Sequence, residues 1–315
     1  MTKDLPEYAL EIENLRKIYT GGSQPPKEAL KGVSLKVKRG SMFALLGPNG
    51  AGKSTMINIM AGLVNKTEGS VKIWDHDIDT DTRRAKSSIG IVPQELNLDA
   101  FFTPKEALDL QAGLYGIPKK ERRTQELLEL VGLEDKADAY ARRLSGGMRR
   151  RLMVAKAMVH NPPILVLDEP TAGVDIELRQ QLWDNVRAMN DMGVTIMLTT
   201  HYLEEAQELC DTIAIINHGE LVAFEDKNTL IRNFGLKELI ITTAEEIKSV
   251  PKKLDIEKIT SELINDNQIK LKYNPLDISF DEIITRISES KYTIKDLSTN
   301  DADLEDIFLS YTKAA

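Results

Sequence analysis

A glycine-rich segment that ends in lysine, serine and threonine is the part of this sequence with the most definite chemistry. Residues 47–55 read Gly-Pro-Asn-Gly-Ala-Gly-Lys-Ser-Thr, which fits the pattern Gly-x-x-x-x-Gly-Lys-Ser of phosphate-binding loops. Glycines accept backbone angles and close approaches that a Cβ would prevent, so backbone N–H groups can converge on an anion at the start of a helix. The lysine adds a positive charge for the β- and γ-phosphates, and the serine hydroxyl is a ligand for Mg²⁺. The segment therefore predicts a nucleoside triphosphate site made by Gly47, Pro48, Asn49, Gly50, Ala51, Gly52, Lys53, Ser54 and Thr55.

Two adjacent carboxylates follow an apolar segment later in the chain. Residues 164–167 read Ile-Leu-Val-Leu, and Asp168 and Glu169 come directly after them. We expect Asp168 to hold Mg²⁺ through water or Ser54, and Glu169 to orient or deprotonate the water that attacks the γ-phosphate. A strand that simply ends in charged residues would give the same local pattern. The phosphate-binding loop upstream favours the catalytic interpretation.

The spacing of apolar side chains predicts the elements that position these residues. Leu10 and Ile12 alternate with glutamates, and Val33, Leu35 and Val37 alternate with polar residues, which is typical of half-buried strands in an antiparallel sheet. Wholly apolar segments favour the strands of a parallel sheet that is covered on both faces. These segments are residues 43–46, 89–92, 164–167 and 194–198.

A helical pattern interrupts these strands. From Gln94 to about Ile164 the apolar residues follow helical spacing, and residues 103–106, Thr-Pro-Lys-Glu, combine a capping box with proline at the first helical position. The interruption predicts a helical subdomain over about residues 96–160, inside an α/β domain over residues 1–225.

The composition changes after a predicted hairpin over residues 212–224. From about Asp226 lysine and glutamate become denser and glycine almost disappears. Residues 269–273 alternate between apolar and basic side chains, which predicts a strand. Apolar residues at helical spacing predict two helices, one with Phe280, Ile283, Ile284 and Ile287 and one with Leu304, Ile307, Phe308 and Tyr311. We expect a small α+β domain over residues 226–315.

Composition and charge narrow the class of protein. The net charge of the 315-residue chain is −8, which argues against a nucleic-acid partner because a nucleic-acid groove favours a basic surface. Cys210 is the only cysteine, so no internal disulfide can form and a reducing cytosol is the expected compartment. No apolar segment approaches the roughly 20 residues of a membrane-spanning helix, and the first residues lack the apolar core of a secretory signal. We expect any membrane role to depend on another subunit.

A third motif narrows the function. Residues 144–148 read Leu-Ser-Gly-Gly-Met and lie between the phosphate-binding loop and the acidic strand. With this motif, residues 8–225 resemble the ATP-binding cassette (ABC) family, whose fold is an α/β P-loop NTPase cassette with a mixed sheet, an antiparallel β-subdomain and a helical subdomain. The resemblance implies that Ser145, Gly146 and Gly147 open a helix whose N-terminus caps the γ-phosphate of an ATP held by another subunit. An ordinary serine N-cap would explain Ser-Gly-Gly alone, but not its position between the other two motifs.

Further residues match motifs of this family in the family's order. Gln94 matches the glutamine loop, which in the family reaches Mg²⁺ and connects the core to the helical subdomain. Residues 172–175, Ala-Gly-Val-Asp, match a loop that crosses the dimer interface, and His201 matches the switch histidine that contacts the γ-phosphate. Tyr19 corresponds to the aromatic residue that stacks on adenine, and packing near its Gly-Gly turn would explain a tyrosine equally well.

The residue after the two glycines departs from the commonest family pattern. Many members have glutamine there, whereas this chain has Met148, followed by three arginines at residues 149–151. This pattern resembles the exporter branch that contains drug-resistance and nodulation-factor efflux ATPases, as does the C-terminal segment 304–309, Leu-Glu-Asp-Ile-Phe-Leu. The arginines fit a solvated helix face and an interfacial role equally well.

The resemblance implies an ATPase subunit that powers transport, in the direction of export, through a separate integral membrane permease. Two copies would form a homodimer at the cytoplasmic face of the membrane, with each ATP between Lys53 of one copy and Ser145 of the other. Hydrolysis with Glu169 and His201 would then reopen the dimer.

Other classes of nucleotide-binding protein explain the motifs less well. Cassette ATPases that act on ribosomes resemble two cassettes in one chain, and those that act on DNA carry a long coiled-coil insertion, whereas this chain has one phosphate-binding loop and no sustained heptads. A kinase or a GTPase leaves the Ser-Gly-Gly motif unexplained. The predicted C-terminal domain fits dimerisation, regulation, coupling to the permease or a structural cap.

Overall fold

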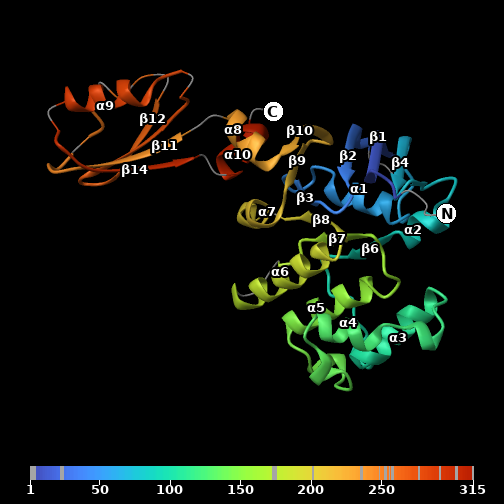
Figure 1. Ribbon diagram of the computed structural model, residues 1–315. Coiled ribbons are helices and arrows are strands. Elements are labelled where there is room, and N and C mark those ends of the chain that lie inside the picture. Colours follow the sequence, from blue (N-terminus) through green and yellow to red (C-terminus); the bar gives the residue numbers. More distant parts are fainter. Residues whose placement is uncertain are drawn as a thin grey trace. The chain divides into compact units, whose positions relative to one another are not determined.

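The computed structural model divides into two compact units, Met1–Glu225 and Asp226–Ala315, which are described separately (Figure 1). The described residues are 5–21, 25–171, 176–200, 202–234, 237–247, 249–251, 254, 256, 259–275, 277–290, 292–301 and 304–313. Of residues 176–178, 232–234, 300, 301, 306 and 313 only the backbone is described.

Six strands form the central sheet of the first unit, in the order β10-β9-β3-β8-β7-β6. They are β3 (Met42–Leu46), β6 (Ile89–Val92), β7 (Ile164–Asp168), β8 (Thr195–Thr199), β9 (Thr212–Asn217) and β10 (Glu220–Asp226). The pairs β3·β8, β3·β9, β6·β7 and β7·β8 are parallel, and every residue of β3 and β8 is buried, as expected for strands covered on both faces. The predicted parallel sheet is therefore confirmed, and β9 and β10 form the predicted hairpin.

A second sheet has the order β2-β1-β4-β5 and is antiparallel throughout. Its strands are β1 (Tyr8–Tyr19), β2 (Lys27–Lys38), β4 (Glu68–Ile73) and β5 (His76–Asp77). The alternation in the sequence predicts β1 and β2. It does not predict their full length, because the two strands stay paired as far as Tyr19 and Lys27. Leu10 and Ile12 pack in one apolar core with Phe43 of the central sheet, so the two sheets share that core.

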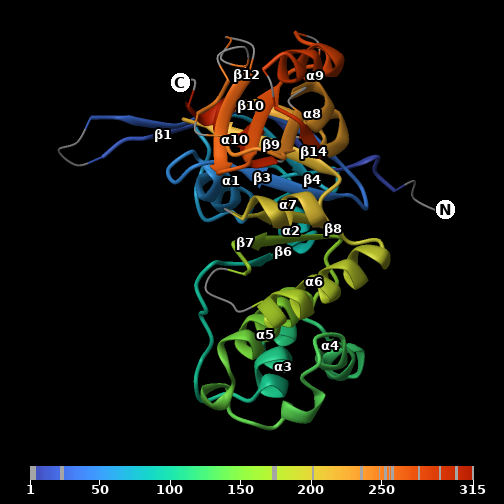
Figure 2. The same ribbon diagram turned by 90° about the vertical axis from the view of Figure 1, so that its left-hand side faces the viewer.

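Seven helices accompany these sheets in the described part of the first unit: α1 (Lys53–Met60), α2 (Thr82–Ser87), α3 (Pro104–Leu114), α4 (Thr124–Leu130), α5 (Gly146–Ala157), α6 (Ile176–Asp191) and α7 (Leu203–Leu209). Helices α3, α4 and α5 contact one another and gather at the lower end of both views (Figures 1 and 2). Short 3₁₀ turns connect them at Lys119–Glu121, Glu134–Lys136 and Ala141–Arg143. The predicted capping box is confirmed, because Thr103 accepts from Glu106 N and the Glu106 side chain accepts from Thr103 N.

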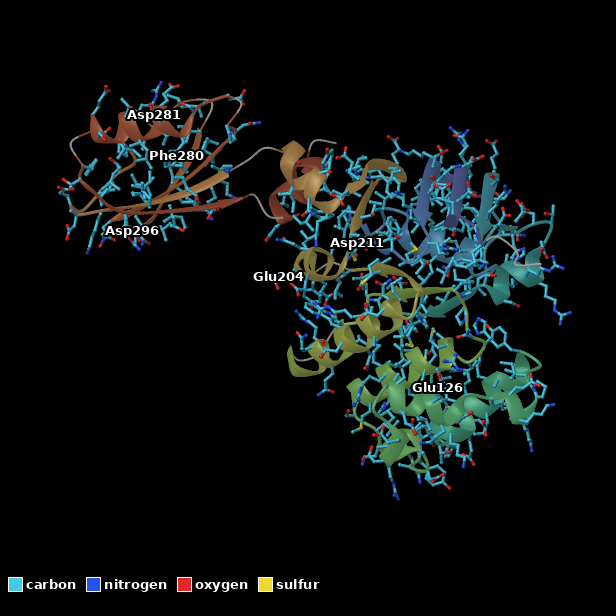
Figure 3. All side chains as sticks on the ribbon, viewed as in Figure 1. Glu126, Glu204, Asp211, Phe280, Asp281 and Asp296 are labelled. Atoms are coloured by element: carbon cyan, nitrogen blue, oxygen red, sulfur yellow. The ribbon has the colours of Figure 1, made fainter. Side chains whose placement is uncertain are left out.

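The second unit is an antiparallel sheet of order β12-β13-β11-β14 with helices. Its elements are α8 (Lys227–Phe234), β11 (Lys237–Thr243), β12 (Ile259–Asn265), β13 (Gln268–Tyr273), α9 (Phe280–Ser288), β14 (Ile294–Asp301) and α10 (Leu304–Lys313). Ile283 and Ile287 of α9 pack on the apolar face of the sheet. Phe280, grouped with them by helical spacing, is 43% exposed at the first position of α9 (Figure 3).

Candidate nucleotide-binding site

The predicted phosphate-binding loop connects β3 to α1, in the strand–loop–helix arrangement that such a loop requires. A Cβ on Gly47 would lie 2.3 Å from the carbonyl oxygen of Ile216 in β9, which is too close for any side chain. Gly52 has φ +115°, and a Cβ there would lie 2.7 Å from the carbonyl oxygen of Ala29 in β2. Neighbouring strands therefore press against the loop from outside, and only glycine fits at these two positions.

Lys53, the first residue of α1, is held inside the loop. Its side chain is buried, and its Nζ donates to the carbonyl oxygens of Gly47 at 2.5 Å and Pro48 at 3.2 Å. Burial lowers the pKa of Lys53, while the negative charges of Glu169 and Asp168 act in the opposite direction. A phosphate oxygen is a stronger acceptor than a neutral carbonyl, so this ammonium group is ready to exchange its loop partners for an anion.

A cavity of about 580 Å³ opens beside the loop. It is lined by Tyr19, Lys27, Ala29, Asn49, Gly50, Ala51, Gly52, Lys53, Ser54, Thr55, Gln94 and Glu169. Tyr19 is 41% exposed, and Lys17 Nζ lies 4.8 Å from the centre of its ring. Sequence reasoning missed Lys27 and Ala29, whose place in the lining follows from the pairing of β1 with β2 rather than from any motif.

The two carboxylates lie at the end of β7, where that strand pairs with β8. Asp168 is opposite Thr199, and the Thr199 hydroxyl donates to Asp168 Oδ1. Glu169 has φ +47°, a left-handed conformation that a non-glycine residue adopts at some cost, and its N–H donates to the Thr199 carbonyl at 3.0 Å. The contact with β8 therefore holds the Glu169 backbone in the conformation that directs its side chain into the cavity.

Gln94 lies just beyond the end of β6, the neighbour of β7 in the sheet. Its side-chain Nε2 donates to Glu169 Oε2 at 2.9 Å. The structure thus brings together Lys53, Ser54, Gln94 and Glu169 around one cavity. Asp168, the residue before Glu169, is the last residue of β7.

The Ser-Gly-Gly motif begins α5. Ser145 is the N-cap, and its side-chain oxygen accepts from Met148 N at 3.2 Å. Ser145 and Gly146 are exposed, Gly147 is buried, and a Cβ on Gly146 would meet no atom within 4 Å. None of these three residues belongs to the described lining of the cavity.

The three arginines that follow do not form a solvated helix face, so that interpretation is wrong. Arg149 Nε donates to the Leu144 carbonyl at 3.0 Å, and Arg151 Nη1 donates to the Val131 carbonyl at 2.7 Å. Arg150 is buried and donates to the carbonyls of Pro93 and Gln94. The guanidinium groups turn back onto backbone carbonyls because loop and helix ends leave such acceptors unpaired.

His201 and residues 172–175 lie outside the described residues, but the residues beside them converge on one buried carboxylate. Glu205 of α7 is fully buried, and it accepts from the hydroxyls of Thr171 and, at 2.7 Å, Thr200. Arg179 Nε lies 3.6 Å from Glu205 Oε1. Sequence reasoning missed Glu205, because nothing in a surface-like Leu-Glu-Glu-Ala segment distinguishes it from its neighbour Glu204.

The described residues show neither a cluster of metal-ligating side chains nor a helix suited to cross a membrane. No group of three or more histidine, cysteine, aspartate or glutamate side chains is arranged there to hold a metal ion. None of the described helices has the length and apolar character needed to span a membrane.

Comparison with known proteins decides the family. The sequence profile of the family described as ABC transporter matches residues 30–172. The linearmycin resistance ATP-binding protein LnrL of Bacillus subtilis (strain 168) is 40% identical over 240 residues, which cover 76% of this chain and 76% of that protein. The chain belongs to the ABC transporter family. Nod factor export ATP-binding protein I of Ralstonia nicotianae is similarly related to this ABC protein, with 42% identity over 224 residues that cover 70% of this chain and 68% of that protein.

Solved structures agree with this assignment. A structure described as the ATP-binding subunit of an ABC transporter superposes with a TM-score of 0.64 and 31% identity, over 72% of this chain and 93% of that one. A dimeric ATP-binding cassette in a post-hydrolysis state, bound to ADP and Pi, gives a TM-score of 0.62 and 31% identity, over 69% of this chain and 98% of that one. The predicted cassette fold is confirmed, and so is the predicted activity: the chain is the ATP-binding and ATP-hydrolysing subunit of an ABC transporter.

Proposed function

We propose that this ABC ATPase powers export and that two copies complete each other's nucleotide sites. The observation that carries the proposal is the separation of the two anion-binding motifs within one chain. The phosphate-binding loop, Gln94 and Glu169 line the cavity, whereas Ser145 and Gly146 lie exposed at the N-terminus of α5 and outside its described lining. A helix N-terminus with open space in front of it suits a phosphate group, and a second subunit can supply that phosphate.

The roles of the residues on the loop side follow from their chemistry. Lys53 and the N–H groups of residues 49–55 would bind the β- and γ-phosphates, and Tyr19 at the rim of the cavity would stack on adenine. Glu169, which receives the Gln94 amide, would orient or deprotonate the attacking water. His201 would contact the γ-phosphate, a role that rests on its motif alone.

The residues present also fit a bound Mg²⁺. This ion prefers oxygen ligands and usually takes only one or two protein groups beside substrate phosphates and water. The exposed Ser54 hydroxyl, the Asp168 carboxylate and the Gln94 side chain would provide the protein part of that set. When bound, the ion would neutralise charge on the transferred phosphate. Asp168 is held in place for this task by the Thr199 hydroxyl.

Export through a separate membrane permease is supported by the relatives, whose names include linearmycin resistance and Nod factor export. The permease would bind near the Gln94 loop and the helical subdomain, and the ATPase would then lie at the cytoplasmic face of the membrane. Apolar side chains are exposed in this region, with Phe101 at 74% and Leu114 at 75% exposure. We also propose that residues 226–315 form an accessory α+β domain, for which dimerisation, regulation, coupling and capping remain alternatives.

The catalytic assignment is tested by Glu169→Gln in the full chain. The amide keeps the size of the side chain but removes the base, so we expect ATP turnover to fall by about 10²-fold or more while nucleotide still binds. Glu204→Gln is the matched control, because Glu204 is an exposed carboxylate on α7 (Figure 3). Turnover of Glu169→Gln near that of the control would overturn the assignment.

A further inference from the structure

We propose that Arg150 is a positioning residue: it fixes the Gln94 loop of each subunit to the same subunit's α5, the helix whose N-terminus would complete the partner's nucleotide site. The proposal rests on the composite site proposed above. Arg150 would thereby connect the nucleotide site that lies in its own subunit to the helix end that completes the nucleotide site of the partner subunit.

The contacts of Arg150 are the first evidence. Its Nη1 donates to the Gln94 carbonyl at 2.8 Å and to the Pro93 carbonyl at 3.0 Å, and the side chain is only 6% exposed. In the part of the chain that the structure describes, no carboxylate pairs with it. Buried charges are normally paired with opposite charge, because burial without a partner is costly. Here two backbone carbonyls of a single loop take that place.

The same loop residue reaches the catalytic carboxylate. Gln94 receives Arg150 at its carbonyl and donates through its side chain to Glu169 Oε2 at 2.9 Å. A continuous series of two hydrogen bonds therefore runs from Arg150 of α5 through Gln94 to Glu169. A shift of the Gln94 side chain, such as a γ-phosphate or Mg²⁺ would cause, is transmitted to the backbone that Arg150 holds.

The position of Arg150 on α5 determines what moves with it. Arg150 lies little more than one helical turn from Ser145, the N-cap of the same helix. Because a hydrogen-bonded helix is stiff over this length, the loop and the exposed Ser145 end keep a fixed relationship while Arg150 stays in place.

The neighbouring arginine provides a comparison within the same helix. Arg151 Nη1 donates to the carbonyls of Val131 at 2.7 Å and Gly132 at 3.1 Å, which both lie in the helical subdomain. It makes the same kind of contact as Arg150 but does not reach the Gln94 loop. Arg151→Met therefore removes equivalent hydrogen bonds without cutting the proposed connection.

The experiment compares the full-length chain with Arg150→Met, Arg150→Lys and Arg151→Met. For each protein kcat for ATP, the dissociation constant for a non-hydrolysable ATP analogue and the Tm are measured. We expect Arg150→Met to lower kcat by about tenfold or more with the dissociation constant unchanged, since misplacing a catalytic group costs rate rather than nucleotide binding. Arg150→Lys, which can donate to the same carbonyls, should recover most of the loss, and Arg151→Met should keep kcat near wild type. If Arg150→Met does not fold, Arg150→Ala, which likewise cannot donate to the two carbonyls, replaces it with the same expected outcomes.

The proposal is overturned if Arg150→Met keeps the wild-type kcat, if Arg151→Met loses as much, or if lysine restores nothing. Failure of the underlying composite site is distinguishable, because Glu169→Gln would then stay monomeric at saturating ATP. A normal Arg150→Met beside an inactive Glu169→Gln would reject the connection alone.

Discussion

Gln94 Nε2 lies 2.9 Å from Glu169 Oε2, although the two residues are 75 positions apart in the sequence. The contact exists because β6 and β7 pair in parallel, with Val92 opposite Leu167, so the segments that follow them leave the sheet at the same edge. A neutral amide next to the carboxylate fixes one of its oxygens without adding charge. Gln94 thereby orients Glu169 within the cavity.

The first prediction concerns the charge of that pair. Gln94→Glu would place a second carboxylate within hydrogen-bonding distance of Glu169, and like charges at this separation raise a carboxyl pKa. The acid side of the profile of kcat against pH should therefore move to higher pH. Glu95→Gln, a change at the exposed neighbouring position, should leave the profile in place. An unchanged profile in Gln94→Glu would contradict the role assigned to this contact.

The second prediction separates capping from catalysis at Ser145. Ser145→Ala and Thr103→Ala each remove an N-cap, of α5 and α3 respectively, and each should destabilise the protein by about 1 kcal/mol in urea unfolding. Ser145→Ala should lower ATP turnover in addition, because its helix end would complete the second half of the site. Equal turnover in the two variants would show that Ser145 only caps its helix.

The third prediction concerns the buried carboxylate of Glu205. Its two oxygens accept from Thr171 and Thr200, and an amide can offer only one acceptor. Glu205→Gln should therefore cost about 1–3 kcal/mol of the free energy of unfolding, since it leaves a buried hydroxyl without its partner. Glu204→Gln on the exposed side of α7 should be nearly neutral, and equal stability of both variants would refute the assignment.

The fourth prediction is a pH dependence of stability from His160. Burial lowers the pKa of His160, while the hydrogen bond to the Ile89 carbonyl acts in the opposite direction. The His160 ring stacks on the Tyr115 ring, with 3.8 Å between the ring centres. As the pH falls through the ordinary histidine range, the unfolded chain takes up a proton that the folded protein does not. Stability must therefore decrease toward acid between the ordinary pKa and the lowered one.

His160→Phe tests this, because phenylalanine keeps an aromatic ring against Tyr115 but does not titrate. Its Tm should fall less than that of the wild type between neutral and mildly acidic pH. A wild-type acid slope in His160→Phe would mean that other groups cause the effect.

The parts of the fold with regular patterns could be predicted from the sequence. The apolar segments that became β3, β6, β7 and β8 could be recognised because both faces of a parallel sheet are covered. The capping box at Thr103 could be recognised because it depends only on neighbouring residues. β12 has no such regularity, since most of its side chains are exposed, and its pairing had to come from the structure.

The residues of the site likewise fall into those that a local motif predicts and those that only distant contacts place. The phosphate-binding loop is a local motif, whereas the place of Lys27 in the cavity depends on the pairing of β2 with β1. In the sequence Arg150 is one of three adjacent arginines that resemble surface charges. Its carbonyl acceptors lie more than fifty positions away and are identified only by the structure. The role of Glu205 could not be predicted either, because its partner Thr171 is distant in the sequence. The roles of His201 and residues 172–175 stay predictions.

The measurement that tests the composite site most directly is the molar mass of Glu169→Gln in solution with and without saturating ATP. ATP should raise the mass from 35.3 kDa to about twice that value, because each nucleotide would be bound between two subunits. The same variant with Gly146→Asp should stay at 35.3 kDa, since the new carboxylate would repel the phosphate while open space at Gly146 leaves the fold intact. A mass of 35.3 kDa for Glu169→Gln at saturating ATP, or an ATP-dependent dimer that Gly146→Asp does not affect, would contradict the composite site.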